Sequence, residues 1–230
     1  MQVGARRVIA VPALGWGPHF GAHEQRTGYA ERLERSFPVL LETVAGVVEA
    51  RDPYTGGHQE RVSVLAEAIA QELGLDEKEI AGIRAAGQLH DIGKVAIPAE
   101  ILSKPTKLTP AEFELVKQHP QAGYDIIKHI DFPWPGARMI LEHHERQDGS
   151  GYPNGLTGEE TLRGSHIIAV ADTVEAMMSH RPYRPGLGAE VALAQITTDR
   201  GTRLDSDAVD SCLRLFEDHD FQFPRLKGLL

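Results

Sequence analysis

Cysteine is almost absent from this sequence of 230 residues. It occurs once, at Cys212, so no disulfide can form within the chain. A lone thiol is typical of a reducing compartment, and we therefore expect a cytoplasmic protein. Because Cys212 stands beside apolar residues such as Leu213, Leu215 and Phe216, we interpret it as a small core residue and not as a reactive thiol.

Long apolar runs and basic blocks are absent as well. No run approaches the ~20 apolar residues of a membrane-spanning helix. Residues 8–14 follow two arginines, but the run is short and Pro12 interrupts it, so we expect no secretion signal. The net charge is -9, which argues against duplex nucleic acid as a partner. An acidic protein still acts on phosphate esters when metal ions lie in its site.

Strand-like alternation of apolar and polar residues is missing too, whereas apolar residues recur at helical spacing from residue 31 onward. This pattern predicts an all-α fold, a single helical bundle. Glycine and proline punctuate residues 1–30, so we predict an irregular or linker segment there and one domain over residues 31–230.

Capping signals place several of the helices. Asp76 precedes Glu79, and Thr109 precedes Pro110 and Glu112, so both sites are predicted helix N-termini. The predicted helices cover residues 31–51, 62–73, 77–89, 110–119, 121–129, 136–144, 165–179, 188–198 and 207–217. The segment 148–158 is rich in glycine and polar residues, which makes it a candidate functional loop.

Histidines beside carboxylates carry the chemical signal. The pair His90-Asp91 is weak by itself, whereas the adjacent His143 and His144 are costly to bury without a function. Asp172 is the only acid in an apolar run, where it must pair, hydrogen-bond or bind a metal, and it alone does not decide between these. Together these side chains favour a centre for Fe, Mn or Zn. A carboxylate also bridges two metals, and such a pair activates water and braces a phosphate.

An ordered series of motifs resembles the HD-GYP family, a subset of the HD phosphohydrolases. In chain order the motifs are RDPYTGGH (51–58), HDIGK (90–94), IP (97–98), KP (104–105), HP (119–120), HHE (143–145), DGSGYP (148–153), IAVAD (168–172) and RPYR (181–184). Each motif is common alone, but the ordered set is specific and covers most of the chain.

The resemblance implies an HD-domain-like helical bundle with an added loop that carries the Gly-Tyr-Pro motif. It also implies a phosphodiesterase that hydrolyses cyclic di-GMP to linear pGpG or GMP in bacterial signalling, with two divalent ions, Fe or Mn. Two alternatives stay open: a catalytically silent receptor of the cyclic dinucleotide, and an HD phosphohydrolase of another nucleotide such as cyclic GMP-AMP. A signalling protein or a second copy of the chain is the partner such a domain would take.

The resemblance also assigns the metal ligands. The first metal takes His58, His90, Asp91 and Asp172, and the second takes Asp91, His119, His143 and His144, so Asp91 is the bridge. Glu145 is expected to orient a metal-bound histidine instead of binding metal itself. Some family members carry a glutamate where this chain has Tyr54, so we expect two metals and not three.

Further residues are assigned to catalysis and substrate. Lys94 is expected to point at the phosphate or at the attacking water, and Arg181 and Arg184 to hold the dinucleotide. Gly151 and Tyr152 belong to the loop that lies against a base or braces the site. Family members often have aspartate at position 180, which is histidine here. The remaining histidines are interpreted as surface or locally bonded residues: His19, His23, His129, His166, His180 and His219.

Overall fold

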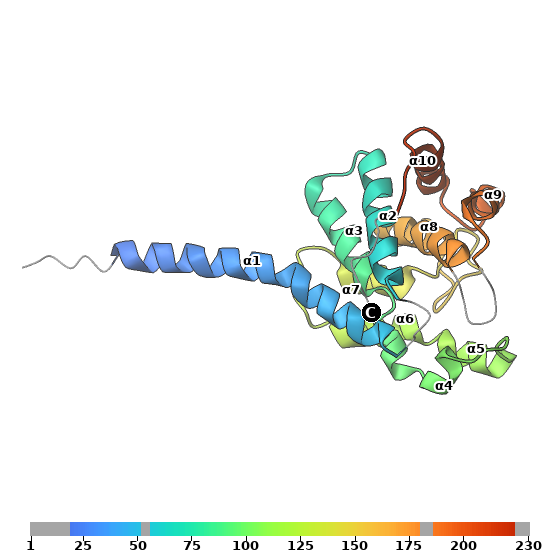
Figure 1. Cartoon of the computed structure of the whole chain (residues 1–230), viewed down its shortest axis with the longest axis horizontal. Helices are drawn as coiled ribbons and strands as arrows, with labels where there is room; N and C mark the ends of the chain where they lie inside the picture. Colours follow the sequence, from blue (N-terminus) through green and yellow to red (C-terminus); the bar gives the residue numbers. More distant parts are fainter. Residues whose placement is uncertain (1–18, 52–55, 180–185, 224–230) are drawn as a thin grey trace, which may run out of the picture. The chain divides into compact units, whose positions relative to one another are not determined.

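A computed structural model describes residues 19–51, 56–179 and 186–223 (Figure 1). Within these ranges the regular elements are all helical, apart from two isolated β-bridges. The elements are α1 His19–Glu49, α2 His58–Glu72, α3 Glu77–Leu89, the 3-10 helix η1 Ile92–Ala96, α4 Ala99–Leu102, α5 Pro110–Val116, α6 His119–Ile127, α7 Gly136–Glu142, α8 Arg163–Met178, α9 Ala189–Asp199 and α10 Ser206–Glu217. The predicted all-α fold is confirmed.

The chain divides into two compact units, Met1–Phe37 and Pro38–Leu230. Helix α1 begins at His19, so the predicted irregular segment is wrong from residue 19 onward. Alanine, glutamate and arginine are frequent over these residues, and an isolated glycine costs a helix only about 1 kcal/mol relative to alanine. The domain boundary at residue 31 stays a prediction.

Both predicted N-termini are confirmed. The Asp76 side chain accepts from the amides of Lys78 and Glu79 at 2.9 and 3.0 Å. Thr109 and Glu112 form a reciprocal capping box at the start of α5. However, α5 ends at Val116, short of the predicted residue 119.

His119 and Pro120 therefore begin α6 and do not end α5. Proline suits the first turn of a helix, where its missing N–H has no helical partner. The elements η1 and α4 were not predicted from the sequence, because helices of four or five residues show no periodicity.

Helices α2 and α8 form the centre of the main core. Helix α8 is buried over most of its length, and α2 packs against α3, α8 and α10. A helix that is apolar on nearly every side belongs in a core.

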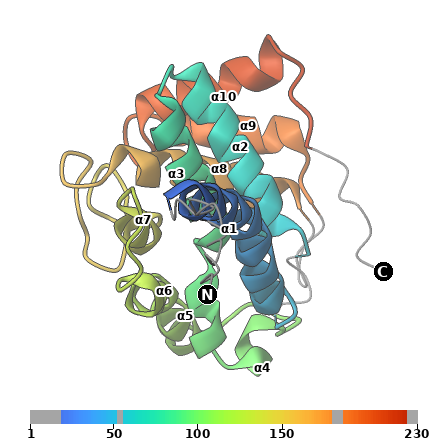
Figure 2. The same cartoon turned by 90° about the vertical axis from the view of Figure 1, so that its left-hand side faces the viewer.

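Helices α4, α5 and α6 lie together on another side of this unit (Figure 2). Cys212 lies in the core, where burial raises the pKa of its thiol to about 12, which confirms its interpretation as a core residue. None of the described helices has the length and apolarity that crossing a bilayer requires.

Two glycines let η1 lie directly on α6. A Cβ atom on Gly93 would lie 1.9 Å from the carbonyl oxygen of His119 and 2.5 Å from the amide nitrogen of Gly123. A Cβ on Gly123 would in turn lie 3.3 Å from the amide nitrogen of Gly93. This contact places the end of α3 beside the start of α6.

Gly93→Ala should therefore destabilise the fold, whereas Gly46→Ala should not. The main chain of α6 cannot move aside as a flexible side chain would, so we expect a loss of about 2 kcal/mol or more for Gly93→Ala. Gly46 lies in α1 with nothing within 4 Å of its Cβ position, so alanine there should add about 0.5–1 kcal/mol. Urea unfolding of both variants measures the difference, and equal stabilities would contradict the close approach.

Candidate metal centre

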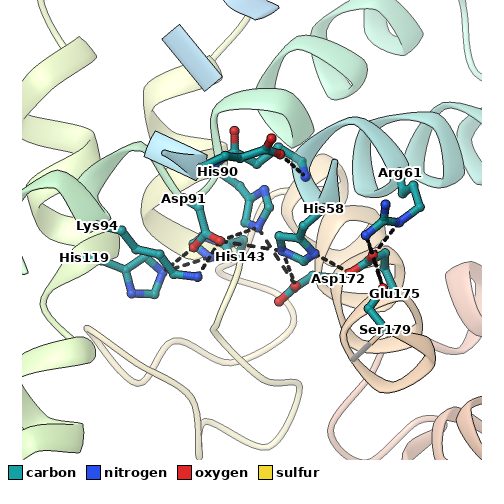
Figure 3. A network of polar contacts seen from close by, with 12 residues as sticks. His58, Arg61, His90, Asp91, Lys94, His119, His143, Asp172, Glu175 and Ser179 are labelled. Carbon is teal, nitrogen blue, oxygen red and sulfur yellow. Dashed lines mark hydrogen bonds and ion pairs between the residues drawn. The ribbon is translucent and has the colours of Figure 1, made fainter. Parts of the chain in front are cut away.

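The structure brings together all the residues predicted as metal ligands. Figure 3 shows them with the exception of His144. They come from the first residue of α2 (His58), the turn after α3 (His90, Asp91), the first residue of α6 (His119), the turn after α7 (His143, His144) and the middle of α8 (Asp172). Most stand at helix ends, so five separate segments reach one point. Most are also almost completely buried, and polar side chains in such surroundings need strong partners.

Asp91 faces imidazoles on both of its sides. Its Oδ2 lies 3.6 Å from His58 Nε2 and 3.4 Å from His90 Nε2. Its Oδ1 lies 3.3 Å from His119 Nε2. The two oxygens therefore point to different groups of ligands, as a bridging carboxylate requires.

Asp91 lies between two clusters and also forms a group with one histidine of each, His90 and His143. The first, here the His58 group, consists of His58, His90 and Asp172, whose ligand atoms lie within 4.8 Å of one another. Its shortest approach is 3.3 Å, from His58 Nε2 to Asp172 Oδ1. The second, here the His143 group, consists of His119, His143 and His144 and satisfies the same criterion.

Main-chain carbonyls set the tautomers of three histidines. His90 Nδ1 donates to Gly87 O at 2.7 Å, His119 Nδ1 to Val116 O at 2.7 Å, and His143 Nδ1 to Ile140 O at 2.6 Å. Because a carbonyl only accepts, Nδ1 carries the proton in the neutral ring, and Nε2 of that ring keeps its lone pair. The lone pairs of His119 and His143 then face each other, with Nε2 atoms 3.3 Å apart. Two facing acceptors fit a cation between them, so these residues suit a metal ion.

The pKa shifts agree with metal binding. Burial lowers the pKa of His119 to about 4 and holds the pKa values of His143 and His144 well below the ordinary 6.5. Burial alone would raise the pKa of Asp91, but Lys94 and the neighbouring histidines hold it well below its ordinary value. Neutral imidazoles and ionised carboxylates are the forms that bind metals.

His58 behaves differently from the other histidines. Burial lowers its pKa, but hydrogen bonds to Asp172, Asp91 and Glu175 outweigh burial and raise the pKa to about 10. In the metal-free protein His58 therefore holds a proton at neutral pH. A divalent ion would have to replace that proton.

Glu175, the partner of His58 Nδ1, was not predicted from the sequence. This buried carboxylate also accepts from Arg61 Nε at 2.6 Å and from Ser179 Oγ at 2.5 Å. Glu175 lies one turn after Asp172 in α8. Like Asp172, Glu175 is an acid among apolar residues of one helix, and this was the signal in the sequence that could have identified it.

Lys94 lies beside the carboxylate that faces both groups. Its Nζ is 2.7 Å from Asp91 Oδ2, because η1 winds the chain back over three residues. The predicted role of Lys94 toward phosphate or water remains a prediction.

The Gly-Tyr-Pro loop packs on the turn that follows α7. A Cβ on Gly151 would lie 2.4 Å from the Cα of Glu145, so only glycine fits there. The amide of Tyr152 donates to His144 O at 3.2 Å, and its ring lies 4.7 Å from the His144 ring. These contacts hold the loop against the turn that carries His144. Contacts of Gly151 and Tyr152 with a substrate remain predictions.

Glu145 holds the loop and not a histidine ring. Its carboxylate accepts from the amides of Asn154 at 2.7 Å and Leu156 at 3.0 Å. The role predicted for Glu145, that of orienting a histidine, belongs to Glu175 instead, because Glu175 bonds to His58.

Some predicted residues lie outside the described ranges: Tyr54, His180, Arg181 and Arg184. Among the described histidines outside the centre, His129 and His219 are exposed, and His166 bonds locally to Gly158 O at 3.1 Å. These three match their interpretation as surface or local residues.

A family model described as "HD domain" matches residues 42–208. The chain belongs to the HD domain family. It is 43% identical over 176 residues to the "Cyclic di-GMP phosphodiesterase response regulator RpfG" of Xanthomonas campestris pv. campestris, covering 76% of this chain and 47% of that protein. It is 37% identical over 196 residues to the "3'3'-cGAMP-specific phosphodiesterase 3" of Vibrio cholerae, covering 84% of this chain and 43% of that protein. The HD domain chain thus spans less than half the length of either relative.

The fold of the HD domain also resembles a solved structure. The HDG"Y"P protein Bd1817 from Bdellovibrio bacteriovorus superposes with a TM-score of 0.59 at 21% identity, covering 70% of this chain and 51% of that one. At this identity the likeness shows the fold alone. Together with the relatives, it confirms the resemblance to HD-GYP proteins that the motifs predicted.

Metal-free protein should lose stability as the pH falls from about 6.5 to 4. Folded protein keeps His119 neutral down to a pKa of about 4, whereas the unfolded chain takes up the proton near 6.5. The unfolded state therefore binds more protons in this window, and His119 alone accounts for about 3 kcal/mol. The low pKa values of His143 and His144 act in the same direction. His58, with its raised pKa of about 10, loses its contribution only above 6.5.

Urea unfolding of chelator-treated protein at several pH values measures this slope. His129→Ala is the matched control, because His129 is exposed and its removal should leave the slope unchanged. A stability that does not vary across the acid window would contradict the buried, neutral imidazoles.

Proposed function

We propose that this HD domain is a metal-dependent phosphodiesterase that hydrolyses cyclic di-GMP to linear pGpG or GMP in bacterial second-messenger signalling. The position of Asp91 between two imidazole clusters carries the proposal, because it suits a two-metal hydrolytic centre. The name of the 43% identical relative supports cyclic di-GMP as the substrate.

Two divalent ions, Fe or Mn, would occupy the centre. The His58 group with Asp91 would hold one, and the His143 group with Asp91 would hold the other. The mixture of imidazole and carboxylate favours these metals over Mg or Ca. When bound, such a pair lowers the pKa of a water and stabilises negative charge on the attacked phosphate.

The residues of the chain supply positioning and charge. Asp91 would bridge the two halves of the centre, and Lys94, whose Nζ lies 2.7 Å from Asp91 Oδ2, would bring a positive charge to the phosphate oxygens. Burial of the centre excludes competing water and strengthens these interactions. Arg181 and Arg184 would hold the second phosphate of the dinucleotide. The Tyr152 ring, which lies tilted against the His144 ring at 4.7 Å, fixes the loop at one edge of the centre.

A second candidate substrate is cyclic GMP-AMP, favoured by the name of the 37% identical relative. A catalytically silent receptor is the other alternative. It is less favoured because each predicted ligand is present and the described ligands converge on one point. Location in the cytoplasm, and a signalling protein or a second copy of the chain as partner, complete the proposal.

Anaerobic turnover of cyclic di-GMP by Fe- or Mn-loaded protein tests the function, with metal counted on the same sample. We expect hydrolysis with about two metals per chain. His143→Ala should lower metal content and reduce the rate by at least ~100-fold, because it removes a ligand from the His143 group. His129→Ala changes an exposed histidine in the same way and should leave both unchanged.

Cyclic GMP-AMP is assayed beside cyclic di-GMP. Faster hydrolysis of cyclic GMP-AMP would transfer the proposal to that substrate. Bound metal without turnover of either dinucleotide would favour the receptor. Full metal content and full turnover in His143→Ala would contradict the ligand assignment.

A further inference from the structure

Once His58 has released its proton, as metal binding requires, the two halves of the centre carry different charge. The His58 group has a carboxylate of its own, Asp172, whose Oδ1 lies 3.3 Å from His58 Nε2. The His143 group consists of imidazoles only and shares Asp91 with the other half. Both halves share Asp91, and Lys94 offsets part of its charge. The negative charge of Asp172 is therefore what distinguishes the His58 group from the His143 group. A divalent ion is therefore attracted more strongly to the His58 group.

The histidines of the two halves also differ in what lies behind them. His119 and His143 donate their Nδ1 protons to neutral main-chain carbonyls. His58 Nδ1 instead contacts the Glu175 carboxylate. A carboxylate behind a ligating imidazole raises its basicity and fixes the orientation of its ring, which strengthens metal binding.

Glu175 is itself held in place on several sides. Arg61 contacts its Oε1 through Nε at 2.6 Å and donates to Gly56 O at 3.2 Å as well. Ser179 Oγ donates to the same Oε1 at 2.5 Å. The side chain of Glu175 is only 1% exposed, so water does not compete for these bonds. Figure 3 shows this chain of contacts running from Arg61 through Glu175 to His58.

We propose that Glu175 is a positioning residue that makes the His58 group the tighter of two unequal metal sites. The inference rests on the metal centre of the proposed function and adds the order in which the centre fills. One metal binds the His58 group first. The His143 group fills second and more weakly.

An ion bound in the His143 group would carry positive charge that the protein balances only in part. A divalent ion among His119, His143 and His144 is neutralised only by a share of Asp91. An added anion, such as a phosphate group, supplies the missing negative charge. Anion and second metal therefore strengthen each other's binding, and the coupling is reciprocal.

Titration of the chelator-treated 230-residue chain with Mn²⁺ tests the order of filling. The loss of free Mn²⁺ signal in electron paramagnetic resonance counts bound metal, and a spin-coupled signal marks sites that are both filled. We expect two phases of one metal each, with dissociation constants at least about tenfold apart. The coupled signal should appear only in the second phase. Inorganic phosphate should tighten the second phase and leave the first unchanged.

Two glutamate variants locate the tight site. Glu175→Gln should weaken the first phase about tenfold or more and leave the second nearly unchanged. Glu142→Gln is the matched control, because Glu142 is also buried and also bonds an arginine and a serine, Arg138 at 2.5 Å and Ser165 at 3.2 Å. It touches no residue of the His58 group in these bonds, so the first phase should stay as in the parent protein.

The outcomes separate this inference from the proposed function. A single phase of two equal sites in the unmodified protein would overturn the inference without any variant. Equal weakening of both phases by Glu175→Gln would also overturn it, since that is the effect of a general loss of structure. Absence of Mn²⁺ binding would refute the metal centre itself, and with it the proposed function.

Discussion

Burial of the Asp91 carboxylate is stable only if positive charge or hydrogen-bond donors lie beside both of its oxygens. The arrangement of the other residues of the site follows from this constraint. A buried carboxylate is costly unless it is paired, and Asp91 faces His58 and His90 with one oxygen and His119 with the other. Lys94 contributes one permanent charge. In the metal-free protein His58, with its raised pKa of about 10, contributes a second charge, whereas the imidazoles with low pKa contribute none. In a loaded centre two metal ions would supply the positive charge beside each oxygen.

The fold is organised to deliver these side chains to one point. The buried helix α8 supplies Asp172 and Glu175 from the core, whereas the turns and first residues of α2, α3, α6 and α7 supply the remaining ligands. The close approach of Gly93 to the main chain of α6 joins two of these segments. Glu145 and Gly151 then fasten the Gly-Tyr-Pro loop beside the centre. Stability and function therefore use the same contacts.

Sequence patterns predicted well whatever depends on neighbours a few residues apart. The caps at Asp76 and Thr109 involve amides within three residues, so the two helix starts were correct. The end of α5 was not predicted, because a proline at position 120 is compatible with the end of one helix or the start of the next. The elements η1 and α4 were not predicted, because helices of four or five residues show no periodicity. The helical state of residues 19–30 was missed for a similar reason, since isolated glycines weaken a helix without ending it.

The order of residues along the chain was enough to predict the helical class and, through the ordered motifs, the chemical types of side chain available for a metal centre. Which oxygen of Asp91 faces which imidazole depends instead on how the helices pack. The tertiary structure also decided that Glu175 supports His58 across 117 residues of chain, and that Glu145 holds a loop. The physical reason is that a hydrogen bond between distant segments leaves no periodic trace along the chain. It exists only once packing has brought its donor and acceptor together.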